Sequence, residues 1–291
     1  MVGIALIVVI ALGYQFNWSW TGLGSYTAPK KTLWDWLQLL IIPLVLALGG
    51  FMFNVLRDRT EHSIAEDSQR ETALQAYFDK MSELLLSKPL HELAEDEEAR
   101  QVARVRTLTV LRRLDTERKV SVLQFLQEAA LINKDKPIVK LGGADFSRII
   151  IRSFRFGGPK FVEVDLSEAN FRGADLSGIF LTGAKLILTN FRDTQLTGAK
   201  LNEADLLQAN LSGANLSGAW LHKCNLRGVY FSEADLRGAD FYEADFGGAN
   251  LRGADLRKAN FSRAIIDKGQ LEQAQSTQDI IPPDADFFTY P

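Results

Sequence analysis

Apolar and polar residues follow three different patterns along the chain of 291 residues. Residues 1–14 and 36–56 are almost entirely apolar. Residues 57 to about 133 place apolar residues three and four positions apart, which is typical of amphipathic helices. From residue 141 to 271 an apolar residue recurs at every fifth position, a period that neither an α-helix nor a single β-strand has. The pattern therefore predicts three parts of different architecture.

The apolar run 36–56 is long enough to cross a bilayer. As a helix its 21 residues would extend about 32 Å, and the hydrocarbon core of a bilayer is about 30 Å thick. We therefore predict a transmembrane helical hairpin over residues 1–56, with spans at about 1–16 and 36–56. The side chains expected at the membrane interfaces are Trp18, Trp20, Trp34, Trp36, Arg57 and Arg59.

Two alternatives to the hairpin stay open at this point. The first run has the length of a cleaved signal peptide, and the second can be a helix buried in a soluble core. Lys30 and Lys31 nearly balance Arg57 and Arg59 in the positive-inside rule, so charge does not decide the orientation. The single cysteine, Cys224, excludes an internal disulfide and favours the cytosolic side for the large C-terminal part.

Residues 57–140 are expected to form a small helical neck module. A first apolar stripe, ended by Pro89, consists of Leu74, Phe78, Met81 and Leu85. The stripe of the next helix is expected to consist of Val102, Val105, Leu108 and Leu111 or Leu114. Asp115 is a typical N-cap residue for a third helix.

Four cations stand near the turn between the last two helices of this module: Arg112, Arg113, Arg118 and Lys119. They make a DNA-binding helix-turn-helix an alternative, and the turn is also able to contact anionic lipid headgroups. Between residues 57 and 136, however, 16 acidic residues outnumber 14 basic ones. This balance favours a packed helical module or a surface for a protein partner.

The five-residue period runs from Phe146 to Leu271 through 26 apolar centres. A small residue, mostly Ala, stands two positions before most centres, and Asp or Asn stands between the two. Segments such as "ANLSG", "ADLRG" and "ANFSR" resemble the A-(D/N)-L-x-x signature of the pentapeptide repeat family. The resemblance implies a right-handed quadrilateral β-helix over residues 141–271, with four pentapeptides in each coil. The fold class expected for the whole chain is mixed: a transmembrane hairpin, a helical module and a β-helix.

In such a coil the centre and the small residue face inward, and residues 20 positions apart are stacked. We therefore expect a ladder of Leu176, Leu196, Leu216, Leu236 and Leu256, and a structural thiol of Cys224 stacked on Ala204 and Ala244. The pattern weakens over residues 149–160, which predicts an irregular first coil or a loop near Gly157 and Gly158. The helical module is expected to cover one open end of the rod, and residues 272–291 to cap the other.

The repeat carries no catalytic pattern. The sequence shows no nucleophile elbow, phosphate-binding loop or metal-ligand spacing, so we expect a non-enzymatic protein with no cofactor, metal or small-molecule substrate. The recurring Asp and Asn suit the corners of a coil because they tolerate turn conformations. The net charge of −3 argues against nucleic acid as a partner, and the rod is about neutral, with 15 acidic and 16 basic residues. A DNA-mimicking, gyrase- or topoisomerase-binding function, which the family includes, stays an alternative, although that function needs an acidic rod.

A rigid rod presents flat faces on which protein partners can dock. Phe180, Lys200 and Trp220 are expected to point outward on one face, one coil apart, with Tyr230 on the opposite face; we predict partner contacts at these four residues. The alternative is that they are ordinary single exposed side chains.

The layout and the segment "RTLTVLRRLDTERKVSVLQFLQEAALI" resemble membrane-anchored members of the family from cyanobacteria. The resemblance implies a bacterial plasma or thylakoid membrane, with the lipid bilayer and the proteins of a membrane complex, photosynthetic complexes included, as partners. The chain would be a tethered scaffold or accessory subunit; an accessory regulator of a membrane transporter is a further alternative.

Overall fold

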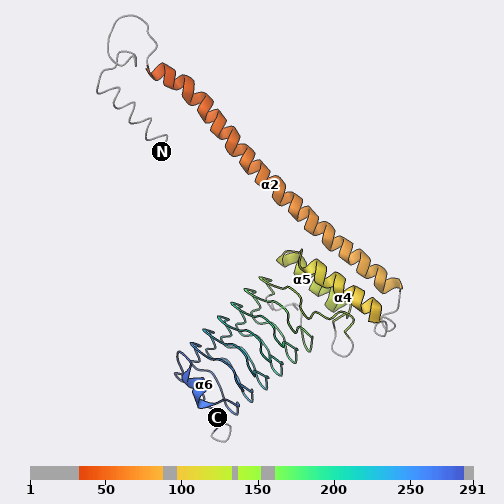
Figure 1. Cartoon of the computed structure of the whole chain (residues 1–291), viewed down its shortest axis with the longest axis vertical. Helices are drawn as coiled ribbons and strands as arrows, with labels where there is room; N and C mark the ends of the chain where they lie inside the picture. Colours follow the sequence, from red (N-terminus) through yellow and green to blue (C-terminus); the bar gives the residue numbers. More distant parts are fainter. Residues whose placement is uncertain (1–32, 88–96, 133–136, 152–160, 285–291) are drawn as a thin grey trace, which may run out of the picture. The chain divides into compact units, whose positions relative to one another are not determined.

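The computed structural model describes residues 33–87, 97–132, 137–151 and 161–284, with side chains from residue 47 onward except for Arg59 and Glu97. Its helices are α2 (Leu33–Ser87), α4 (Glu97–Leu111), α5 (Thr116–Glu128) and α6 (Lys268–Glu272), and a rod of stacked coils lies between α5 and α6 in the chain (Figure 1). The chain divides into two compact units, Met1–Asp67 and Ser68–Pro291.

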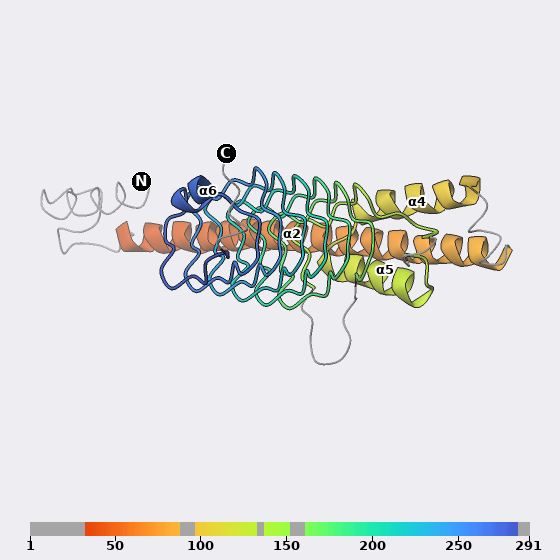
Figure 2. The same cartoon turned by 90° about the horizontal axis from the view of Figure 1, so that it is seen from below.

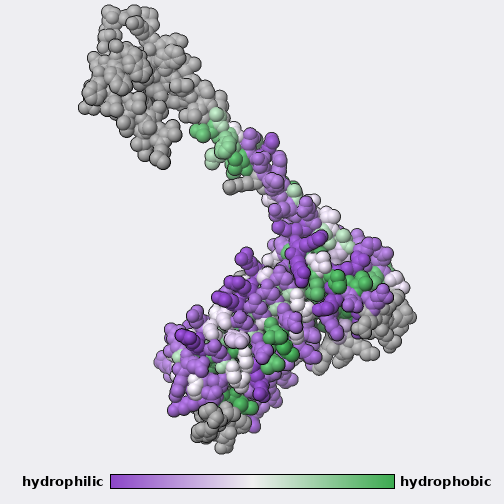
Figure 3. All heavy atoms as spheres, in the orientation of Figure 1, coloured by the Kyte–Doolittle hydropathy of each residue, from purple (hydrophilic) through white to green (hydrophobic). Residues whose placement is uncertain are grey.

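In the first unit, the described residues belong to α2, which contains the whole of the apolar run 36–56. In the second half of this apolar run, five large apolar side chains are between 55% and 69% exposed: Leu48, Phe51, Met52, Phe53 and Leu56. Figure 3 shows this apolar group as green spheres on the exposed part of α2. Within the part of the chain that the structure describes, no helix combines the length and the apolar character that crossing a bilayer requires.

The transmembrane hairpin therefore stays a prediction. Its first span, together with Trp18 and Trp20, lies outside the described residues, and so do the side chains of Trp34, Trp36 and Arg59. Arg57 is exposed, and its Nε lies 3.3 Å from Glu61 Oε1, one helical turn away. This ion pair on the helix surface does not test the predicted position of Arg57 at a membrane interface.

The second unit begins with the last part of α2, which packs against α4 and α5 in one apolar core. The predicted stripe of Leu74, Phe78, Met81 and Leu85 is confirmed as the face that joins this core. The stripe predicted for the next helix, α4, is confirmed at Leu111 and Leu114, which are buried, and at Leu108, which packs against the core, but it is wrong at Val102 and Val105, which are 39% and 57% exposed. In the first turns of α4 the buried face consists of Ala99, Ala103 and Thr107.

The row of α4 that faces inward is decided by close packing rather than by side-chain hydrophobicity. Small alanines let neighbouring helices approach, and the hydroxyl of Thr107 lies 3.0 Å from that of Tyr77 in the core. This contact gives both buried hydroxyl groups a hydrogen-bond partner. Burial of the Tyr77 hydroxyl raises its pKa to about 12.

Asp115 is the N-cap of α5, as predicted, and its carboxylate accepts a hydrogen bond from the amide of Arg118 at 3.0 Å. The guanidinium of Arg118 also pairs with Glu71 at 2.9 Å. Lys119 is only 6% exposed, and its Nζ lies 3.9 Å from Asp145 Oδ2 in the first coil. Two of the four cations near this turn therefore hold α5 to its neighbours and do not form a basic surface for DNA.

The rod repeats every 20 residues through parallel bridges, with one bridging residue on each of four sides. Within one pentapeptide, four of the five backbone amides donate to backbone carbonyls. In residues 186–190, for example, the bonds are Leu186 to Asp205 (2.7 Å), Leu188 to Leu207 (2.9 Å), Thr189 to Leu186 (3.2 Å) and Asn190 to Ala169 (2.9 Å). Each side is too short for a regular strand, so the described coils contain isolated bridges (Figure 2). The predicted leucine ladder is confirmed, because the bridge residues next to its members pair in series from Asp175 to Asp255.

Where an Asp or Asn precedes the centre, the amide of the residue after the centre bonds to that Asp or Asn side chain, two residues before it. The amide of Arg192, for example, donates to Asn190 Oδ1 at 3.1 Å. The same turn bond forms at fifteen positions: Asp145, Asp165, Asn170, Asp175, Asn190, Asp205, Asn210, Asn215, Asn225, Asp235, Asp240, Asp245, Asn250, Asp255 and Asn260.

This arrangement corrects the expected role of Asp and Asn. They stand on the sides of the coil and accept a hydrogen bond from the corner, whereas the left-handed corner conformation falls on the second residue after each centre. Gly198 (φ 63°) and Glu203 (φ 61°) are two such corner residues. A carboxylate engaged in a turn bond has a structural role, which explains the recurring Asp without hydrolytic chemistry.

The first coil is longer than the others. Asp145 pairs with Asn170 and Ile150 with Asp175, 25 residues apart, whereas the pairs from Asp165–Lys185 to Asp245–Ile265 span 20. The irregular first coil is therefore confirmed, and the 26 centres do not stack without interruption. The predicted loop itself falls within residues 152–160, outside the described residues. An insertion of one whole pentapeptide leaves the five-residue period intact, so the period could not reveal it.

The C-terminal end of the rod is closed by α6 and the residues that follow it. Asp267 caps α6, and Leu271, the last predicted centre, lies in this helix rather than in a coil. The buried side chain of Gln270 donates from Nε2 to the carbonyls of Phe246 (2.7 Å) and Ala249 (2.8 Å). These bonds pair backbone acceptors that a further coil would otherwise cover.

Candidate partner-contact face

Three successive coils break the turn rule on the same side of the rod. Phe180, Lys200 and Trp220 occupy the position of Asp or Asn, and they bridge in series. Lys185, Gln195 and Tyr230 also break the rule, but each lies between Asp or Asn neighbours in its own column. We call Phe180, Lys200 and Trp220 the aromatic column. A forgone turn bond costs about 0.5–1.5 kcal/mol of stability, so folding alone does not explain the column.

The side chains of the aromatic column contact one another. Lys200 Nζ lies 4.5 Å from the ring centroid of Phe180 and 5.3 Å from that of Trp220, distances at which the ammonium group is attracted to both rings. Lys200 therefore joins the two rings of the column, which lie one coil apart on the same side as predicted. Trp220 remains 49% exposed, so its ring is available to a partner.

Further aromatic side chains extend the column around the next corner of the coil, and the sequence pattern did not predict this extension. His222 stacks on Trp220 with ring centroids 6.2 Å apart, and Tyr242 meets His222 edge-on at 5.9 Å. Arg263 Nη1 donates to Tyr242 Oη at 2.9 Å. The aromatic column together with His222, Tyr242 and Arg263 is here called the aromatic strip. The sequence did contain a signal for this contact, because His222 and Tyr242 are 20 residues apart and residues 20 apart are stacked. Both residues lie one position after a centre, outside the position at which outward side chains were sought.

The opposite flank of the aromatic column is a corner at which a glycine recurs. Gly178, Gly198, Gly218 and Gly238 occupy it in four successive coils, all with positive φ between 63° and 69°. A Cβ atom at Gly198, Gly218 or Gly238 would meet no neighbouring atom within 4 Å. The open space at these glycines, beside the rings of the column, leaves room for the backbone of a partner to approach the rod.

Tyr230 does not belong to the strip. It pairs with Asn210 and Asn250, in the column two sides away from the aromatic column, as predicted, and it is 50% exposed. Because no other large side chain of its column accompanies it, Tyr230 has the character of an ordinary exposed aromatic residue.

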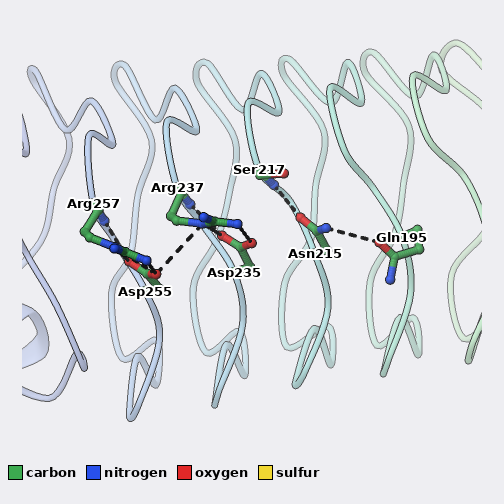
Figure 4. A network of polar contacts seen from close by, with 7 residues as sticks. All are labelled: Gln195, Asn215, Ser217, Asp235, Arg237, Asp255 and Arg257. Atoms are coloured by element: carbon green, nitrogen blue, oxygen red, sulfur yellow. Dashed lines mark hydrogen bonds and ion pairs between the residues drawn. The ribbon is translucent and has the colours of Figure 1, made fainter.

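The side of the rod before the glycine corner carries a polar network (Figure 4). Arg237 Nη2 lies 2.7 Å from Asp235 Oδ2, and Arg257 Nη2 lies 2.6 Å from Asp255 Oδ2. Hydrogen bonds from these arginines hold the pKa of Asp235 and of Asp255 below the ordinary value. Paired carboxylates give this side a mixed charge, unlike the unpaired negative charge that mimicry of DNA needs.

Cys224 is buried, as predicted, and its thiol donates to the carbonyl of Leu201 at 3.0 Å. Thr189 and Thr194, which occupy the same inward slot, make the same bond to the carbonyls of Leu166 (3.0 Å) and Phe171 (2.9 Å). Burial raises the pKa of Cys224 to about 12, so the thiol stays protonated and structural.

A family model described as pentapeptide repeats matches eight copies, over residues 155–187, 189–228 and 230–267. No curated protein sequence matches the chain significantly.

Several solved structures are similar to the rod. HetL, a pentapeptide repeat protein involved in heterocyst differentiation regulation in the cyanobacterium Nostoc sp. strain PCC 7120, is 28% identical; the match covers 55% of this chain and 93% of HetL, with a TM-score of 0.23. QnrB1, a plasmid-mediated fluoroquinolone resistance protein, is 22% identical over 54% and 70% of the two chains, with a TM-score of 0.29. A pentapeptide repeat protein of the Arabidopsis thaliana thylakoid lumen is 30% identical over 45% and 70%, with a TM-score of 0.15.

Proposed function

The chain belongs to the pentapeptide repeat family through its rod, and from this premise we propose that it is a non-enzymatic scaffold that binds a protein partner along the aromatic strip. The observation that carries the proposal is the loss of the turn bond at Phe180, Lys200 and Trp220 in three successive coils. Aromatic side chains and arginine are enriched in protein interfaces, and the contacts of Lys200 with the rings of Phe180 and Trp220 hold these rings in place before binding.

The second part of the proposal is a membrane tether. Residues 36–56 supply an uncharged run of sufficient length, and the five exposed apolar side chains between Leu48 and Leu56 favour a lipid environment over water. A tethered rod would be an accessory subunit of a membrane complex on the cytosolic face of a plasma or thylakoid membrane. Regulation of a membrane transporter is one form that this role can take.

The alternative function is mimicry of DNA toward gyrase or another topoisomerase. This alternative comes from the family, which includes such proteins. The nearly equal numbers of acidic and basic residues in the rod weigh against it, as do the paired carboxylates beside the glycine corner.

The partner proposal is tested by in-situ cross-linking of the full chain, mild detergent extraction and mass spectrometry. We expect one complex to co-purify in fixed ratio, with cross-links to Lys200 or Lys223, and to be lost with Phe180→Asn, Lys200→Asn and Trp220→Asn combined. Tyr230→Asn, on the opposite side, is the matched control and should retain the complex. Retention by the triple variant, or recovery of topoisomerase subunits, would contradict the proposal.

The tether is tested separately by washing membranes with alkaline carbonate. A chain that spans the bilayer stays in the membrane pellet, whereas a chain held by protein contacts is released. Release of the full chain would refute the tether without affecting the partner proposal.

A further inference from the structure

A pocket of about 170 Å³ lies among residues of α4 and of the segment that leads into the first coil. Its lining consists of Arg100, Gln101, Arg104, Pro137, Ile138 and Lys140. Three of these residues are cations, and none of the described lining residues is acidic. The pocket shares no residue with the aromatic strip and needs an explanation of its own.

The two arginines lie one helical turn apart on the same face of α4, where like charges repel each other. Arg104 Nη2 donates to the carbonyl of Gly142 at 3.2 Å, which holds its guanidinium at the start of the first coil. Elsewhere in this unit Arg118 pairs with carboxylates. At the pocket, positive charges converge without a carboxylate among the described lining residues.

The Nε–H group of Arg100 is buried and has no hydrogen-bond acceptor among the described residues. Buried donors without an acceptor are rare in folded proteins. An oxygen atom held in the pocket would accept this hydrogen bond, and a negative charge would offset the repulsion among the three cations.

We propose that this pocket binds one phosphate group. The planar guanidinium groups of Arg100 and Arg104 can donate paired hydrogen bonds to phosphate oxygens, and Lys140 supplies a third positive charge. Because pockets for whole organic ligands usually measure about 300–1,000 Å³, the pocket admits the phosphate group rather than an entire nucleotide. The bound group would tie α4 to residues 137–142 at the start of the rod. This inference is independent of the proposed function.

The probe for the first experiment is inorganic phosphate, titrated into the full chain in detergent and followed by ³¹P NMR line broadening at constant ionic strength. We expect saturable broadening that chloride does not abolish. Arg100→Gln combined with Lys140→Gln should weaken the affinity about tenfold or more, because it removes two charged donors. Arg106→Gln is the matched control, since Arg106 is an exposed arginine of α4 outside the pocket lining. Circular dichroism shows whether each variant is folded.

A second arm distinguishes the sources of the phosphate group. Competition by vesicles that contain phosphatidic acid, but not by phosphatidylcholine vesicles, would support a lipid headgroup as the ligand. Competition by soluble phosphate esters alone would support a small metabolite. The proposal is overturned if the wild-type chain produces no saturable broadening, or if the folded double variant binds phosphate as tightly as Arg106→Gln does. Arg100→Lys, which keeps the charge and removes the planar fork, provides a check should the double variant not fold.

Discussion

The aromatic column leads to a prediction that separates binding from folding. Replacing Phe180, Lys200 and Trp220 with Asn restores the side chain that the repeat uses at this position. A column selected for a partner should lose binding and keep its stability, whereas a column that holds the rod together should lose stability.

The magnitudes can be worked from the structure. Asn at 180 and 200 would offer new acceptors to the amides of Thr182 and Asn202, and two such bonds stabilise by about 1–3 kcal/mol together. Asn at 220 adds no bond, because the amide of His222 already donates to Asn202 Oδ1 at 3.2 Å. The two lost contacts between Lys200 and the rings contribute about 1–2 kcal/mol, and the lost stacking of Trp220 on His222 contributes about 0.5–1.5 kcal/mol. We therefore expect the free energy of unfolding to change by less than about 1 kcal/mol, which is little for a folded domain.

Amide hydrogen exchange of the full chain is the assay. Exchange at Thr182 and Asn202 should slow in the triple variant as their amides gain acceptors, and exchange at buried amides of the same coils should stay unchanged. Leu201→Ala is the comparison, because deleting a fully buried leucine side chain costs about 2–5 kcal/mol. If the triple variant loses as much stability as Leu201→Ala, the column is structural and the reasoning is refuted.

Three further predictions concern the ends, the interior and the surface of the rod. Gln270→Ala should cost about 1–3 kcal/mol in urea unfolding, because it leaves buried carbonyl groups unpaired, while the exposed Gln273→Ala should cost nothing measurable. Cys224 should resist maleimide at neutral pH until urea unfolds the rod, because burial raises its pKa to about 12; labelling of the native protein would contradict its structural role. Arg237→Gln should destabilise the rod slightly at pH 7, because the hydrogen bond from Arg237 lowers the pKa of Asp235 in the folded state. The stabilisation from this pair is present above the unfolded-state pKa of 3.8 and is lost as the pH falls through the folded-state pKa. Below the folded-state pKa the substitution should therefore have no effect on stability. Equal losses at both pH values in acid and neutral urea titrations would show that the pair contributes nothing through charge.

Sequence periodicity was sufficient to predict the inside of the rod. With a period of five, the described centres from Phe146 to Ile266 fall in inward slots, so the burial of Cys224 and the stacking of Phe180, Lys200 and Trp220 followed directly. The N-cap at Asp115 was equally local, because the capping bond joins residues only three positions apart.

Other features depended on which residues meet in space. An extra pentapeptide in the first coil leaves the period unchanged, so the longer coil is revealed by the bridges of Asp145 with Asn170 and of Ile150 with Asp175. Val102 and Val105 are more hydrophobic than Ala99 and Ala103, yet the alanines face the core, because helix packing selects the row that lets backbones approach closely.

By itself the sequence determined the repeat, its inward residues and the column of unusual side chains, because a solenoid converts fixed spacing in the chain into fixed position in space. The tertiary structure alone decided that His222, Tyr242 and Arg263 extend this column and that Arg100 and Lys140 share a pocket. Those neighbours come from corners and from different elements, and their proximity depends on how the elements pack rather than on any period of the chain.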